Sequence, residues 1–151
     1  MALSAKLFRL RPCLLLPALL LAASCSGDGR RPVFPVRGQV LYEGKPPPGA
    51  LVIFHPLNDP DPRAPRAVAR VDADGNFTPT TYRTDDGAAA GEYAVTVTWV
   101  QEVDNQSAPK EEQRPPRNLV PDRYGKPETS GLRVRIEKGP NQLKPFLLTR
   151  K

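Results

Sequence analysis

The fold of this chain is decided by residues 68–100, which read VARVDADGNFTPTTY, then RTDDGAAA, then GEYAVTVTWV. In the last part, Tyr93, Val95, Val97 and Trp99 alternate with smaller residues, as in a strand that turns one face to a core. Before it, Asp74-Gly75 predicts a tight turn, because glycine adopts the positive φ values that hairpin turns require. The stretch therefore predicts strand, turn, strand, loop and strand, with Trp99 at one end of the core.

The same pattern continues on both sides of this stretch. Both faces of residues 50–56 are apolar, which predicts a central strand, and Pro79 indicates an edge or a bulge. The chain has 19 prolines, which break helices and exclude a helical bundle. We expect an all-β sandwich of about seven strands, and a long polar loop at 101–118. The predicted strands are 35–42, 50–56, 67–72, 77–82, 92–100, 132–137 and 142–149, with 67–72 and 77–82 pairing as a hairpin.

The chain begins with a predicted export signal. Residues 1–11 are basic, and the apolar run 14–22 is shorter than the roughly 20 residues that span a bilayer. This order is typical of a secretory signal peptide. The residues before and at Cys25, LAASC, resemble the lipobox of bacterial lipoproteins, although Ala22 stands where leucine is common. The alternative is an ordinary signal peptide cut after Ser24, which would leave Cys25 as a free thiol.

The lipobox resemblance implies an anchored protein of the bacterial cell envelope. Cys25 would carry the lipid and become the N-terminus after removal of signal peptide 1–24. Ser26 stands where aspartate directs retention in the inner membrane, so we expect the outer membrane. Residues 25–34 would then form a flexible tether to a domain at 35–149. The only other cysteine is Cys13, so we expect no disulfide in that domain.

Three motifs resemble the carboxypeptidase regulatory-like domain, a transthyretin-like, Ig-like Greek-key sandwich. They are GQVLYEGKP at 38–46 followed by GALVIF at 49–54, then DADGNF at 72–77, and GEYAVTV at 91–97. Short bacterial lipoproteins carry one such domain after a lipobox. The resemblance implies a non-catalytic accessory or structural module with no general ligand and no cofactor.

Charge and aromatic patterning argue against a nucleic-acid partner. The formal net charge is +6, and three of the positive residues precede Cys25, which leaves about +3 after processing. No basic stripe with interleaved aromatic residues is present.

A catalytic site is not expected. His55 is the only histidine, and no serine lies in a Gly-x-Ser-x-Gly elbow. The transthyretin fold also hosts a hydrolase that relies on several histidines and a C-terminal Tyr-Arg-Gly-Ser, whereas this chain ends in Leu-Thr-Arg-Lys. That hydrolase is the remote alternative.

Two groups of residues suggest binding sites. Calcium takes six to eight oxygen ligands, but the turns that carry Asp72, Asp74, Asp85 and Asp86 lack the rest of a calcium loop, so we expect no metal. Tyr82, Tyr93, Trp99 and Tyr124 would stack on sugars if they were exposed in a row, and would otherwise belong to the core.

The sequence thus predicts a lipid-anchored, non-enzymatic envelope module. It would meet the membrane through Cys25 and present a surface, above all loop 101–118, to a protein partner or an envelope structure. The alternative is a carbohydrate-binding module at the cell surface.

Overall fold

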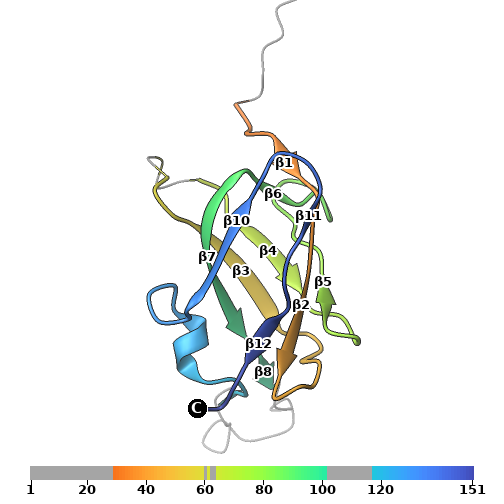
Figure 1. Ribbon diagram of the computed structural model, residues 1–151, viewed down its shortest axis with the longest axis vertical. Helices are drawn as coiled ribbons and strands as arrows, with labels where there is room; N and C mark the ends of the chain where they lie inside the picture. The colour runs from red at the N-terminus through yellow and green to blue at the C-terminus, as the bar shows by residue number, and fades with distance from the viewer. Residues whose placement is uncertain (1–28, 60, 62–63, 102–116) are drawn as a thin grey trace, which may run out of the picture. The chain divides into compact units, whose positions relative to one another are not determined.

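Two β-sheets face one another across the core of this protein (Figure 1). The computed structural model describes residues 29–59, 61, 64–101 and 117–151. The first sheet is antiparallel throughout, in the order β10-β7-β3-β4. Its strands are β3 (Leu51–Pro56), β4 (Ala67–Arg70), β7 (Gly91–Thr98) and β10 (Leu132–Ile136).

The second sheet is built around β2 (Val36–Tyr42). The short strand β5 (Asn76–Phe77) pairs antiparallel with β2. Strands β11 (Asn141–Gln142) and β12 (Phe146–Leu148) pair parallel with β2 and follow one another along its other edge (Figure 1). Asn141 pairs with Val36 and Phe146 with Val40, so this edge contains one residue more than β2. The predicted strand 142–149 is therefore interrupted, at a point that includes Pro145, which has no N–H to donate.

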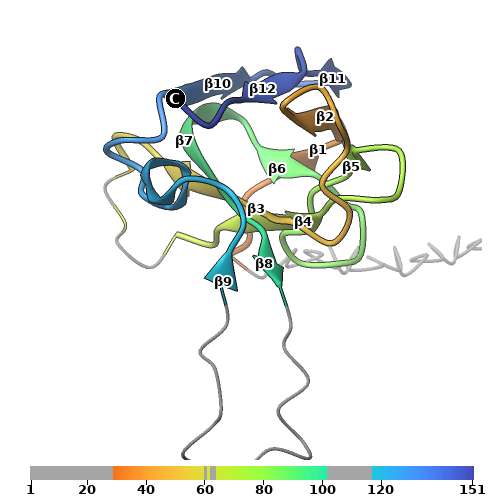
Figure 2. The ribbon, with the colours of Figure 1, turned by 90° about the horizontal axis from the view of Figure 1, so that it is seen from below.

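Three smaller units complete the fold. Strand β1 (Val33–Phe34) pairs with β6 (Ala88–Ala89) at one end of the sandwich. At the other end, β8 (Val100–Gln101) pairs with β9 (Arg117–Asn118) in a ribbon that Figure 2 shows projecting from the sheets. A 3-10 helix, η1 (Asp122–Gly125), packs on β7.

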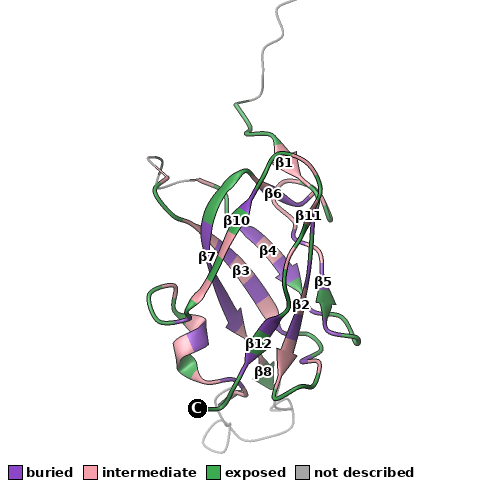
Figure 3. Cartoon of the chain, viewed as in Figure 1, coloured by how far each residue is buried: buried purple, intermediate pink, exposed green. Residues whose placement is uncertain are grey.

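Aromatic side chains fill the space between the sheets. Phe54 of the first sheet lies between Phe77 and Tyr93, with ring centroids 6.1 and 5.9 Å away. Phe77 also stacks on Phe146 at 5.8 Å. Gly38 of β2 makes room for this cluster, because a Cβ atom there would lie 2.3 Å from the Phe77 ring. Figure 3 shows the buried residues concentrated in the long strands of the two sheets.

The predicted fold class is confirmed: the protein is an all-β sandwich. The predicted central strand is β3, which lies between β4 and β7. The connections are of the Greek-key kind, because β7 returns to pair with β3 while β5 joins the other sheet. Trp99 packs at the edge of the core, as expected.

The predicted hairpin between 67–72 and 77–82 is wrong beyond its turn. Asp72 N–H donates to Asn76 O at 2.8 Å, but β4 then pairs with β3 whereas β5 pairs with β2. The two arms diverge because the Phe77 side chain enters the core against Gly38. They meet again only where Val68 and Thr80 exchange hydrogen bonds of 2.9 and 2.8 Å.

Three further expectations need correction. Val33 and Phe34, assigned to the flexible tether, form strand β1. The ends of the expected loop 101–118 are held as the β8–β9 ribbon, and 102–116 lie outside the described residues. Both faces of β7 are buried from Tyr93 to Val97, where one face would have been solvated, and η1 packs on this strand.

Residues 31–151 form one compact unit, and the leader with Cys25 lies outside the described residues. In the part of the chain that the structure describes, no helix has the length and apolar character needed to cross a membrane.

Candidate functional site

His55 lies on the outer face of the first sheet and bonds to another side chain of that face. Its Nε2 is 2.9 Å from Thr96 Oγ1. Partial burial lowers the pKa of His55, and Arg66 lowers it further, while Glu128 opposes the shift. Thr96 is only 3% exposed, so its hydroxyl is inaccessible to a substrate. Among the described residues, His55 has no hydrogen bond to a carboxylate or a serine, and the geometry offers no nucleophile for acyl transfer.

Two aspartates of the turns accept hydrogen bonds from backbone N–H groups. Asp72 Oδ1 accepts hydrogen bonds from the N–H groups of Asp74 and Asn76 at 2.9 and 2.7 Å. The Asp86 carboxylate accepts from three successive N–H groups, at 81–83, at 2.7 to 3.0 Å. Burial opposes ionisation of Asp86, but these three bonds prevail and lower its pKa. In the described ranges, no three acidic, histidine or cysteine side chains gather as metal ligands.

The four aromatic candidates do not form a row. Tyr93 and Tyr124 are 5 and 6% exposed and belong to the core. Trp99 is half-buried beside Tyr42, and its Nε1 donates to Pro48 O at 3.0 Å. Tyr82 lies at the opposite end of the sandwich, where its hydroxyl accepts a hydrogen bond from Arg31 N–H at 3.3 Å. The sugar-stacking surface of the alternative hypothesis is therefore not assembled by these side chains.

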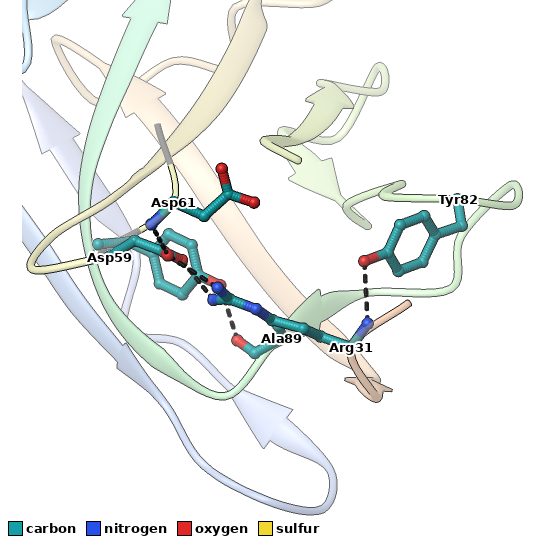
Figure 4. A network of polar contacts seen from close by, with 6 residues as sticks. Arg31, Asp59, Asp61, Tyr82 and Ala89 are labelled. Atoms are coloured by element: carbon teal, nitrogen blue, oxygen red, sulfur yellow. Dashed lines mark hydrogen bonds and ion pairs between the residues drawn. The ribbon is translucent and has the colours of Figure 1, made fainter. Parts of the chain in front are cut away.

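Sequence reasoning missed a polar clamp where the chain enters the domain (Figure 4). The Arg31 guanidinium binds both oxygens of Asp59, and its Nη2–Oδ1 distance is 2.8 Å. Asp61 N–H also donates to Asp59 Oδ1, at 3.0 Å. The hydrogen bond to Arg31 is the main cause that lowers the pKa of Asp59. The chain is thus attached to the body from Arg31 onward, through residues far apart in the sequence that carry no local motif.

Sequence reasoning also missed a groove between β10 and the β11–β12 edge, which lie side by side (Figures 1 and 2). Its floor is apolar, with Leu132, Val134 and Leu143 packed against the core. Its rim carries the exposed residues Arg133, Arg135 and Lys144, and no acidic residue lines it. The alternation of Leu132 to Ile136 was visible in the sequence, but the facing edge was not.

The backbone of β10 is unpaired on the groove side. Leu57 N–H donates to Glu92 O at 2.8 Å, so the Glu92 backbone points toward β3. Because N–H and C=O groups alternate in direction along a strand, Tyr93 and Val95 point toward β10. Their register partners are Val134 and Leu132. Arg133 lies between these two partners and Arg135 lies beside them, so the backbone N–H and C=O groups of both arginines face away from β7. No described residue pairs with these groups.

The chain matches no family model, no curated protein and no solved structure. Its kinship with carboxypeptidase regulatory-like domains therefore stays a prediction from the sequence motifs.

Proposed function

We propose that this protein is a lipid-anchored module of the bacterial cell envelope that binds a partner protein and catalyses no reaction. The lipobox-like residues that end at Cys25 support the anchor, and Ser26 supports the outer-membrane location. The engaged His55 and the turn-forming aspartates support a binding role over a catalytic one.

One observation carries the proposal: the free edge of β10 lies beside an apolar groove. Free strand edges pair with other chains unless a protein blocks them, and an apolar floor adds burial to that pairing. This combination favours a protein partner over a sugar, which would need exposed aromatic rings.

The Arg31–Asp59 clamp bears on where the surface would be presented. Five residues lie between Cys25 and Arg31, and the six steps from one to the other span at most about 20 Å when the chain is fully extended. Because the clamp attaches Arg31 to the domain, a lipid on Cys25 would keep the β1–β6 end near the membrane.

The test is photo-crosslinking in intact cells with a crosslinking amino acid at one of two exposed positions. Lys144 lines the groove, and Asp74 lies in the β4–β5 turn as the matched control. We expect a protein partner captured from Lys144 and not from Asp74. The Cys25→Ser form should capture less, because it is not held beside its target. Equal capture from both positions, or none, would contradict the proposal.

A further inference from the structure

We propose that the groove takes an extended segment of the partner in which acidic and apolar residues alternate, added as a strand antiparallel to β10. This inference rests on the proposed function and names the partner's chemistry.

The backbone of β10 supplies the pairing. Arg133 and Arg135 offer two N–H donors and two C=O acceptors on the same edge. In an antiparallel ladder, such groups bond to residues directly opposite, whose side chains lie on the same face as those of Arg133 and Arg135. An antiparallel partner fits because every pair in this sheet is antiparallel.

The two faces of the incoming strand would meet different surroundings. Side chains on the inner face would contact the floor formed by Leu132, Val134 and Leu143. Side chains on the outer face would stand beside the guanidinium groups of Arg133 and Arg135. Since successive side chains of a strand point to opposite faces, the matching sequence alternates apolar and charged residues.

The charges that line the groove determine whether the charged residues of the bound segment should be acidic or basic. Arg133, Arg135 and Lys144 all line the groove without an acid among its lining residues. Arg135 does have acidic neighbours, Glu92 at 3.8 Å and Glu137 at 3.9 Å. All three side chains are more than half exposed, so these pairs are weak and leave Arg135 able to attract a further carboxylate.

A second copy of this chain fits the edge poorly. Pairing two β10 edges antiparallel through their free groups places Arg133 and Arg135 opposite arginines of the other copy. Like charges directly opposite one another destabilise a sheet pair. The same charges would merely protect the edge from aggregation if no partner existed, and that alternative predicts no peptide binding.

The probe is the fluorescently labelled peptide Glu-Val-Glu-Val-Glu-Val-Glu with blocked ends, titrated by anisotropy into the full-length protein in a non-ionic detergent. Controls are the same peptide with lysine for glutamate, and a peptide with the four glutamates and three valines in separate blocks. We expect only the alternating acidic peptide to bind. On binding it should slow hydrogen exchange at the Arg133 and Arg135 amides.

Matched variants test the charges. Arg133→Gln with Arg135→Gln should weaken binding about tenfold, since exposed charge pairs contribute up to roughly 1 kcal/mol each. Arg70→Gln, an exposed arginine on the other outer strand of the same sheet, should leave binding unchanged. All three substitutions keep the side chain long and polar, so unfolding midpoints should stay equal.

Peptide methylation tests the geometry. N-methyl groups on the glutamates remove the N–H groups that face β10 and should abolish binding, whereas N-methyl groups on the valines should be tolerated. The opposite result, equal binding of the lysine peptide, or no binding at all would overturn the inference. If the peptide fails but cells still yield a crosslink from Lys144, the proposed binding role stands without this ligand class. If both fail, both proposals are wrong.

Discussion

The chain crosses from the first sheet to the second on two sides of the sandwich. The two crossings begin alike, but they leave the edge of the first sheet in different states. On the β4–β5 side, the chain leaves the first sheet through the turn Asp72 to Asn76 and enters the second. On the β10–β11 side, it does the same through the turn Glu137 to Asn141. Both turns close across five residues, and both lead into diverging strands.

Only the β4–β5 side is closed again. After β5 the chain returns to the first sheet, where Thr80 exchanges two hydrogen bonds with Val68. On the β10–β11 side the chain continues along β2 instead, so β10 keeps a free edge. Whether a strand edge stays free therefore depends on whether the segment after the turn returns to pair with that strand. A local turn motif does not predict this return.

The largest expected difference is in the free energy of unfolding that is lost when an apolar side chain between the sheets is truncated on each side. Phe77→Ala on the β4–β5 side should lower the free energy of unfolding by about 3–5 kcal/mol, because it removes a buried ring. Leu143→Ala on the β10–β11 side should lower it by only about 1–2 kcal/mol, because Leu143 is half-buried. Urea denaturation measures both. Equal losses would show that the two sides are packed alike.

The turns should differ in the same experiment. Asn141→Ala should cost about 1–3 kcal/mol, because the Asn141 side chain alone joins the two ends of its turn, accepting from Glu137 N–H at 2.9 Å and donating to Glu137 O at 3.0 Å. Asp72→Ala should cost about 0.5–1.5 kcal/mol, because the backbone bond from Asp72 to Asn76 remains. A greater loss from Asp72→Ala would contradict this view of the turns.

Acid should loosen the β4–β5 side selectively. The pKa of Asp86 is lowered in the folded protein, so its stabilising contribution is present above its unfolded-state value and is lost as the pH falls through the folded value. Amide exchange at residues 81–83, corrected for intrinsic rates, should therefore speed up below about pH 4. Asp86→Asn should remove this pH dependence while β10 exchange stays unchanged. Persistence of the pH dependence in Asp86→Asn would assign it to another group.

The smallest expected difference is local: it concerns the exchange rates of backbone amides at the closed side and at the free edge of β10. In hydrogen exchange, the Val68 and Thr80 amides should be protected, because each donates within a bonded pair. The Arg133 and Arg135 amides should exchange about as fast as in an open chain, although both lie in a strand. Protection of these two amides in the free protein would mean that the edge is already covered.

Much of the fold was predictable because it depends on local pattern. Residues 92–98 alternate, both faces of 51–54 are apolar, and Asp74-Gly75 marks a turn, so the main strands and their sandwich class follow from the sequence. The surface that we propose for partner binding was harder to predict. The expectation centred on loop 101–118, of which the structure describes only the paired ends.

The sequence by itself determined which segments extend, where they turn and which side chains seek the core, because strand alternation and turn chemistry act over a few residues. Only the tertiary structure decided which strands pair. Phe77 draws β5 to the second sheet through contact with Gly38, and Arg31 meets Asp59 across 28 positions. The free backbone of Arg133 and Arg135 results from such long-range choices, since a strand edge is open only when no other segment reaches it.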